Sequence, residues 1–143
     1  DLYCGAGTIT CYVADLAERI LGIEYLEEAV ADARDNAARN GLQHLQFMAG
    51  DMAKVLQPEL TESYGRPEVI IADPPRGGMD AKVVQRLLAL APPTILYISC
   101  NPATQARDLQ LMDAAYAVDH VQPVDMFPQT SHVENIVRLQ RRS

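Results

Sequence analysis

Short apolar runs alternate with stretches of helical pattern along most of the chain, and this alternation limits the fold more than any other feature. The runs are rich in aliphatic residues and bounded by turn residues, as buried strands are. Strands that alternate with helices predict a parallel sheet flanked by helices. We expect strands at residues 1–3, Arg19–Ile23, Leu45–Met48, Val69–Ala72 and Thr94–Ile98, and helices at Thr8–Ala17, Leu26–Asn40, Ala81–Ala91 and Thr104–Ala114.

Two more runs, Tyr116–Val121 and Val133–Leu139, read as closing strands joined by a long loop. Glu59–Pro67 is the interior stretch most typical of a loop. The length of 143 residues fits one domain, residues 1–143. Because Asp1-Leu2-Tyr3 resembles the end of a strand, we expect this domain to be part of a longer protein, with an upstream segment missing.

Residues able to carry chemistry follow the predicted strands at their carboxyl ends. In an open parallel sheet this edge is where ligands bind. The sequence therefore predicts that these residues share one site: Gly5, Gly7, Glu24, Asp51, Asp73 and Cys100.

The first half of the chain has features of a nucleoside site. Gly5-Ala6-Gly7 lets the backbone approach a ligand, and Glu24, at the end of the second strand, can accept from both ribose hydroxyls. Asp51 can accept from an adenine amino group, or it can cap the next helix. Position 10 is Thr10, so the third glycine of a dinucleotide fingerprint is missing and a dehydrogenase is a distant alternative.

Cys100 lies between the strand Thr94–Ile98 and a helix start at which Asn101 suits the N-cap and Pro102 the first turn. The positive end of a helix lowers the pKa of a nearby thiol and so favours a nucleophile. The alternative is a small, buried apolar cysteine.

Two loops complete the candidate reaction centre. Asp73-Pro74-Pro75-Arg76 places a carboxylate on a turn that two prolines stiffen. Tips of this kind occur in amino-methyltransferases, where an aromatic residue usually follows, whereas here the next residue is Arg76. Glu134 stands near the start of the last strand, where an isolated glutamate is most often solvated surface.

The motifs, taken together, resemble a known family. Asp-x-Tyr-x-Gly-x-Gly with Glu24 is similar to the first motifs of class I S-adenosylmethionine-dependent methyltransferases. Adding Asp73–Arg76, Ser99–Pro102, Asp125–Pro128 and His132-Val133-Glu134 gives a set that closely resembles the RNA uracil-5-methyltransferases, which form 5-methyluridine in transfer RNA and ribosomal RNA.

The resemblance implies an α/β, Rossmann-like class I methyltransferase fold, with a mostly parallel sheet, a C-terminal antiparallel strand and helices on both faces. It implies Cys100 as the nucleophile that adds to carbon 6 of uracil, and Glu134 as the base that removes the carbon 5 proton. Asp73 and Arg76 are the expected substrate contacts. The expected contacts of S-adenosyl-L-methionine are Tyr3, Gly5, Gly7, Thr8, Glu24, Asp51 and Asp73.

The charge and the cysteine content of the chain limit which partners it can bind. A net charge of −7 argues against a broad nucleic-acid-binding patch on this chain, so we expect RNA to be held mainly by the missing upstream part. The three cysteines form no zinc spacing, and free thiols fit a reducing cytoplasm. We expect no metal and no membrane span. The alternatives are an amino-methyltransferase that does not need Cys100 and a cofactor-binding module that is inactive in isolation.

Overall fold

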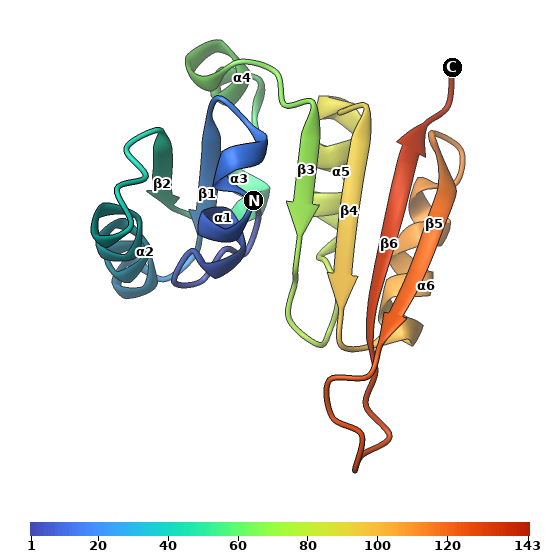
Figure 1. Ribbon diagram of the computed structural model, residues 1–143. Coiled ribbons are helices and arrows are strands. Elements are labelled where there is room, and N and C mark those ends of the chain that lie inside the picture. Colours follow the sequence, from blue (N-terminus) through green and yellow to red (C-terminus); the bar gives the residue numbers. More distant parts are fainter. The chain divides into compact units, whose positions relative to one another are not determined.

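The computed structural model describes residues 1–143, which form two compact units. Asp1–Val55 is called the N-terminal unit here, and Leu56–Ser143 the C-terminal unit. Figure 1 shows the first in blue to teal and the second in green to red.

The N-terminal unit is built around a pair of parallel strands. Glu24, at the end of one strand, lies opposite Ala49 of the other, so the carboxyl ends of both strands meet at one edge. Leu2 adds an isolated parallel bridge to Ile23. In chain order the elements are α1 (Thr8–Tyr12), the short 3-10 helix η1 (Ala14–Leu16), β1 (Ile20–Glu24), α2 (Glu27–Arg39), β2 (Leu45–Ala49) and α3 (Met52–Val55).

Apolar packing holds this unit together. Val30, Ala33 and Ala37 are buried on α2 at helical spacing, in one cluster with Phe47 of β2. The ring of Phe47 fills the space over Gly22, where an added Cβ would lie 2.6 Å from a ring carbon. The packing between α2 and the strands is therefore formed by small residues of the helix against the large ring of a strand residue.

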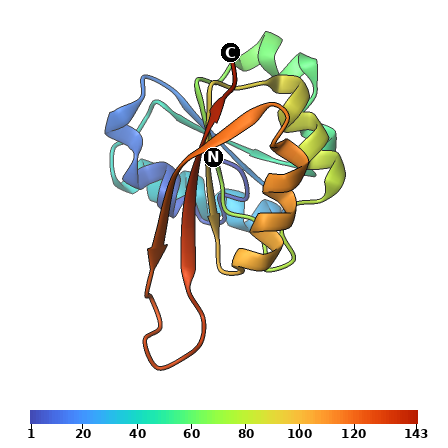
Figure 2. The same cartoon turned by 90° about the vertical axis from the view of Figure 1, so that its right-hand side faces the viewer.

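The C-terminal unit contains a four-stranded sheet in the order β3-β4-β6-β5. β3 and β4 are parallel, whereas β6 is antiparallel to both of its neighbours. Helices α5 and α6 lie on the same face of this sheet (Figures 1 and 2). In chain order the elements are α4 (Pro58–Tyr64), β3 (Val69–Ala72), α5 (Ala81–Leu90), β4 (Thr94–Ser99), α6 (Pro102–Met112), β5 (Tyr116–Val124) and β6 (Glu134–Arg141).

Alternate residues of β4 form the centre of this unit's core. Ile95 and Tyr97 are completely buried and Ser99 nearly so, as expected of a central strand with one face under helices. Val84 and Leu87 of α5 are buried with them. The sheet thus fixes the place where β4 ends and α6 begins.

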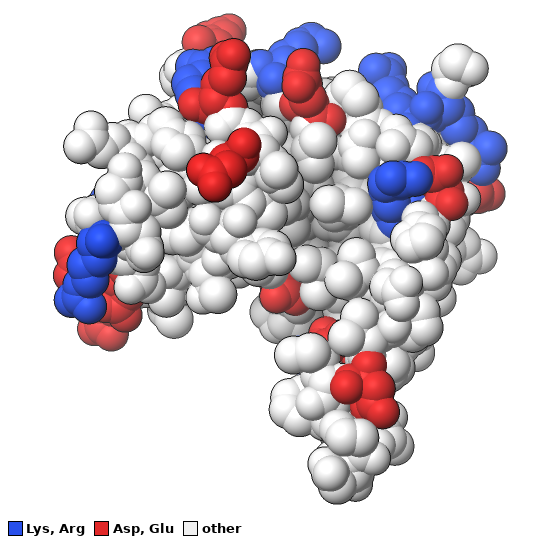
Figure 3. Space-filling model, in the orientation of Figure 1, with Lys and Arg blue, Asp and Glu red and all other residues white.

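The loop between β5 and β6 extends beyond the end of the sheet (Figures 1 and 2). Met126 and Phe127 in this loop are exposed. Residues 124–133 contain no Lys or Arg, and the face in Figure 3 shows only uncharged and acidic side chains on this projection.

Two expectations about local structure are wrong. The helix expected at Thr8–Ala17 is two short pieces, α1 and η1, because the backbone of Val13 leaves the helical region between them. Glu59–Pro67, expected as a loop, contains most of α4. Its first residue, Pro58, starts that helix, since proline lacks only an N–H that the first turn leaves unpaired anyway.

None of the helices combines the length and the apolar character that a membrane-spanning helix needs.

Candidate active site

In the N-terminal unit, the Tyr3–Gly7 turn follows the bridge at Leu2. Tyr3, Gly5 and Gly7 all have positive φ, at 62°, 52° and 76°. An added Cβ on Gly5 would meet nothing within 4 Å, so a ligand could approach the backbone there. At Gly7 the same Cβ would lie 3.0 Å from Phe47, so Gly7 serves close packing as well.

Glu24 is joined to this glycine turn. Its carboxylate accepts hydrogen bonds from the backbone N–H groups of Gly5 at 3.1 Å, Tyr25 at 2.7 Å and Leu26 at 3.1 Å. A carboxylate has about four lone-pair positions, so these three donors orient the group and leave capacity for one more. The two predicted parts of the nucleoside site therefore lie in contact.

Asp51 follows β2 at the same edge of the strand pair. The backbone N–H of Gly50 donates to the carbonyl of Glu24 at 2.8 Å, which places the start of this loop beside Glu24. The Asp51 carboxylate accepts from the N–H of Ala53 at 2.9 Å, as a helix cap does. The cap is thus formed in the structure, and the adenine contact stays a prediction. Thr8 is the exposed first residue of α1.

In the C-terminal unit, Asp73 and Cys100 follow neighbouring parallel strands. Ala72 of β3 pairs with Tyr97 of β4, so both residues lie at the same end of the sheet. Cys100 is half-buried. Directly after it, the side chain of Asn101 accepts from the N–H of Ala103 at 3.2 Å, and Pro102 begins α6. The predicted strand–cysteine–helix turn is confirmed, and the nucleophilic role of Cys100 stays a prediction.

Glu134 arrives at this turn on the antiparallel strand β6. Ser99, the last residue of β4, pairs with Asn135, so Cys100 and Glu134 are the next residues along the chain at this end of the two strands. Burial, and then the nearby charge of Glu134, raise the pKa of Asp73 even though the residue remains accessible to solvent. Asp73, Cys100 and Glu134 therefore gather at one end of the four-stranded sheet.

Arg76 and His132 join the two loops that flank this end. The guanidinium of Arg76 lies 3.4 Å from Nδ1 of His132, and both side chains are exposed. The backbone N–H of His132 in turn donates to the hydroxyl of Thr130 at 3.1 Å. In this structure His132 therefore links the loop before Glu134 to the loop after Asp73.

Two buried polar residues beneath these loops were not predicted from the sequence. Gln105 and Asp108, both on α6, are 1% and 0% exposed. With the buried Met112 they form a stripe at helical spacing, which is the position expected of apolar residues. Polar residues on the stripe that faces the sheet are the signal that could have identified them. Their partners include Arg107 and Asn135.

The other cysteines differ from Cys100 in setting. Cys4 is buried in the N-terminal unit, and burial is the main reason that the pKa of its thiol rises to about 11. Cys11 is half-buried in α1, and no disulfide joins the three thiols. No group of three or more His, Cys, Asp or Glu side chains is placed to hold a metal ion.

Comparison with known sequences finds relatives that match nearly the whole chain. The model of the tRNA (uracil-5-)-methyltransferase family matches residues 1–142. An uncharacterized RNA methyltransferase of Bacteroides thetaiotaomicron is 54% identical over 142 residues, which are 99% of this chain and 31% of that protein. One from Porphyromonas gingivalis is 52% identical over 145 residues, covering 100% of this chain and 31% of that protein. The chain therefore spans about 31% of the length of these relatives.

Solved structures of methyltransferases also match the chain, which identifies its fold. The crystal structure of Pyrococcus abyssi tRNA (uracil-54, C5)-methyltransferase, in complex with S-adenosyl-L-homocysteine, matches with a TM-score of 0.83 and 34% identity over 97% of this chain and 33% of that one. An N-methyltransferase from Bradyrhizobium japonicum matches with a TM-score of 0.78 at 13% identity, over 99% of this chain and 76% of that one, which shows the fold alone. The expected Rossmann-like class I methyltransferase fold is confirmed. With the family model matched from residue 1 to residue 142, the chain belongs to the tRNA (uracil-5-)-methyltransferase family.

Proposed function

We propose that residues 1–143 form the catalytic domain of an RNA methyltransferase that transfers a methyl group from S-adenosyl-L-methionine to carbon 5 of a uridine in tRNA or rRNA. The observation that carries the proposal is the pairing of β4 with β6, whose last pair, Ser99 with Asn135, has Cys100 and Glu134 as its immediate neighbours in the chain. Asp73 lies near Glu134, because the charge of Glu134 contributes to the raised pKa of Asp73. One thiol, of Cys100, and two carboxyl groups, of Glu134 and Asp73, thus lie at a strand end, which is where parallel α/β sheets bind ligands.

The N-terminal unit fits the cofactor. Gly5 offers an open backbone, and Glu24 keeps a lone pair for a ribose hydroxyl while three backbone N–H groups hold it in place. We assign the cofactor contacts to this turn and to the strand ends, at Tyr3, Gly5, Gly7, Thr8, Glu24, Asp51 and Asp73. When bound, S-adenosyl-L-methionine supplies an electrophilic methyl group.

The chemistry of this chain begins at Cys100. Carbon 5 of uracil is a poor nucleophile, so the Cys100 thiolate adds to carbon 6 and shifts the electrons of the 5,6 double bond toward carbon 5 and the carbonyl oxygen. After carbon 5 has gained its methyl group, the carboxylate of Glu134 takes the proton from that carbon. The electrons of the broken C–H bond restore the double bond, and the Cys100 sulfur leaves as thiolate. Asp73 and Arg76 hold the uracil edge.

The RNA is bound mainly by parts of the protein outside these 143 residues. The net charge of −7 supports this proposal, because RNA is itself negatively charged. The chain also spans only about 31% of the length of its relatives, so other parts of the protein can bind the RNA. We further propose a cytoplasmic enzyme, because three free cysteines suit a reducing compartment.

A cysteine exchange tests the mechanism. In the whole protein, Cys100→Ala should still bind S-adenosyl-L-methionine by calorimetry and yet yield no 5-methyluridine in unmodified tRNA and rRNA. Cys11→Ala is the matched control, because Cys11 is also a half-buried free thiol, and it should keep full activity. Normal 5-methyluridine formation by Cys100→Ala would refute the covalent mechanism, whereas an amino-methyltransferase would form no 5-methyluridine with either the variant or the wild type.

A second exchange tests the base. Glu134→Gln should transfer the methyl group and then stall, because the carbon 5 proton stays in place and the sulfur cannot leave. Loss of positioned base catalysis is expected to slow release about 10²–10⁴-fold. The stalled species is a covalent protein–RNA adduct that migrates slowly on a denaturing gel. If no adduct forms while free methylated RNA accumulates, Glu134 is not the base.

A further inference from the structure

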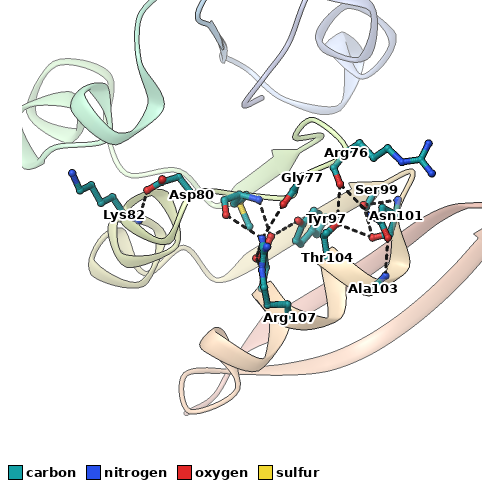
Figure 4. A network of polar contacts seen from close by, with 12 residues as sticks. Arg76, Gly77, Asp80, Lys82, Tyr97, Ser99, Asn101, Ala103, Thr104 and Arg107 are labelled. Carbon is teal, nitrogen blue, oxygen red and sulfur yellow. Dashed lines mark hydrogen bonds and ion pairs between the residues drawn. The ribbon is translucent and has the colours of Figure 1, made fainter.

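Helix α6 presents a row of polar side chains to the loop that follows Asp73. Asn101, Thr104 and Arg107 follow one another at intervals of three residues, and Asp108 comes four residues after Thr104, so the four side chains lie on neighbouring faces of the helix. All four bind the backbone of residues 76–79, as Figure 4 shows for most of them. A helix that devotes one side to a single loop fixes where that loop lies.

The first half of the row holds the carbonyl of Arg76. The side-chain amide of Asn101 donates to it at 3.3 Å and the hydroxyl of Thr104 at 3.2 Å. Asn101 immediately follows Cys100, and the Ser99 hydroxyl donates to the Asn101 carbonyl at 3.1 Å. The loop after Asp73 is thus bonded to the turn that carries Cys100.

The second half of the row holds the end of the loop. The guanidinium of Arg107 donates to the carbonyl of Gly77 at 3.0 Å and to that of Met79 at 3.4 Å. The carboxylate of Asp108 accepts from the N–H of Met79 at 2.8 Å. Arg107 and Asp108 therefore bind both the carbonyl and the N–H of Met79.

The charge of Asp108 is fully buried and fully partnered. Arg107 donates to one oxygen of Asp108 from Nε at 2.9 Å and from Nη2 at 2.7 Å, and the Tyr97 hydroxyl donates to the other at 2.6 Å. Burial, together with this hydrogen bond, raises the pKa of the Tyr97 phenol, so the hydroxyl stays a donor. A buried ionic group with every partner in place admits one geometry, because any displacement leaves a charge unpaired.

We propose that Arg107 and Asp108 are positioning residues of the methylation reaction. They hold Gly77–Met79 on α6, and they thereby fix Asp73 and Arg76 relative to Cys100 without touching the substrate or the cofactor. This inference rests on the proposed function, and it adds that the reaction depends on the rigidity of this attachment.

Gly78 gives a way to loosen the attachment from the loop side. Its φ is +80°, and an added Cβ would lie 2.6 Å from a carboxylate oxygen of Asp108 and 2.7 Å from Nη2 of Arg107. A methyl group there must displace these two side chains or the loop. Gly77, its neighbour, is the matched control, since a Cβ there would meet nothing within 4 Å.

The test compares three variants of the whole protein: Gly78→Ala, Gly77→Ala and Arg107→Lys. We expect Gly78→Ala to lower kcat about 10²-fold, the loss that a misplacement of about 1 Å can cause. Its KM for S-adenosyl-L-methionine should rise less than its kcat falls, because most of the assigned cofactor contacts lie in the N-terminal unit. Its thermal midpoint should fall, since the added Cβ disturbs the buried Asp108 contacts, so kcat is measured at a temperature at which the variant is fully folded. Gly77→Ala should keep the wild-type kcat. Arg107→Lys, which keeps the charge but loses the planar fork, should lie between them.

Amide hydrogen exchange supplies a readout that does not depend on methylation. The Met79 N–H should exchange faster in Gly78→Ala and Arg107→Lys than in the wild type, and at the wild-type rate in Gly77→Ala. In the double variant Gly78→Ala/Arg107→Lys the loss of kcat should equal the larger single loss, because both changes break the same attachment.

The possible outcomes separate the positioning role of Arg107 and Asp108 from the proposed function. A loosened Met79 N–H with wild-type kcat in Gly78→Ala would overturn the positioning role and leave the proposed function intact. A loss of activity that only follows the fraction of unfolded protein would also overturn it. Absence of 5-methyluridine with the wild-type protein would contradict the proposed function itself.

Discussion

The two units both present loops at strand ends, but they hold these loops by different means. In the N-terminal unit the glycine turn rests on apolar packing, with Gly7 against Phe47, and on two partly exposed side chains: the Glu24 carboxylate accepts from Gly5, and the Asn36 amide donates to the Ala6 carbonyl at 2.9 Å. In the C-terminal unit buried polar side chains, Gln105 and Asp108 above all, connect loop to helix to strand. Of the polar residues that are buried, Thr10 belongs to the first unit and the rest to the second.

The difference follows from what each kind of contact can specify. Apolar packing is not directional and tolerates small changes of shape, whereas a buried hydrogen-bond network fails when one partner is lost. Binding through backbone groups tolerates small displacements. Proton and methyl transfer need the reacting groups within a fraction of an ångström. The buried hydrogen-bond network, which tolerates less displacement, thus belongs to the unit in which we place the chemistry.

The largest effect is expected from Asp108→Ala in the C-terminal unit. The change leaves the Met79 N–H and the Tyr97 hydroxyl without an acceptor and removes the partner of Arg107. Each of these two buried donors left without an acceptor costs about 1–3 kcal/mol of unfolding free energy, which urea denaturation measures. Asp113→Ala is the control, because the Asp113 side chain is 76% exposed, and it should stay within about 0.5 kcal/mol of the wild type. Equal costs would remove the contrast between the units.

An intermediate effect is expected when one ring in each unit is changed conservatively. Tyr97→Phe removes only the oxygen that donates to Asp108, and it should cost about 1.5–3 kcal/mol because the acceptor is charged. Phe47→Leu removes more atoms but breaks no polar contact, and it should cost about 1.5 kcal/mol or less. Urea denaturation measures both variants. A larger loss for Phe47→Leu would show that the N-terminal core is the more demanding one.

The smallest effect is expected from the carboxylates at the end of the four-stranded sheet. The pKa of Asp73 is raised, so the folded state keeps that proton to a higher pH than the unfolded state does. The free energy of unfolding should therefore fall as the pH rises from the usual aspartate range, about pH 4, through the raised pKa. Glu134→Gln removes one cause of the raised pKa, so its stability should fall less over this range. Parallel curves of unfolding free energy against pH for the two proteins would contradict the coupling.

Much of the fold could be predicted because the local signals agree with the structure. β3 occupies Val69–Ala72 as expected, and α6 begins at Pro102 with Asn101 as its cap. The errors arose where a residue is compatible with two local structures or gives no local signal. Pro58 can stop a helix or start one, and only the surrounding packing decides which. Val13 gives no sign in the sequence that its backbone will interrupt a helix.

The candidate site divides in the same way. Residues at strand ends, such as Glu24, Asp73 and Cys100, could be predicted because the edge of a parallel sheet collects them. Gln105 and Asp108 could not, since charged and amide side chains in a helix usually face water. Only the three-dimensional structure shows that Gln105 donates to the carbonyls of Tyr97 at 2.9 Å and Asn135 at 3.1 Å.

The position of β6 has a consequence for the order in which the protein is made. Glu134–Arg141 is synthesised after β5 but inserts between β4 and β5, so β4 keeps one unpaired edge until ribosomes have added residue 141. An open edge of this kind invites pairing with other chains. The insertion of β6 therefore pairs that edge of β4 and brings Glu134 to the end of the sheet that carries Cys100, so one folding step protects the edge and assembles the proposed reaction centre.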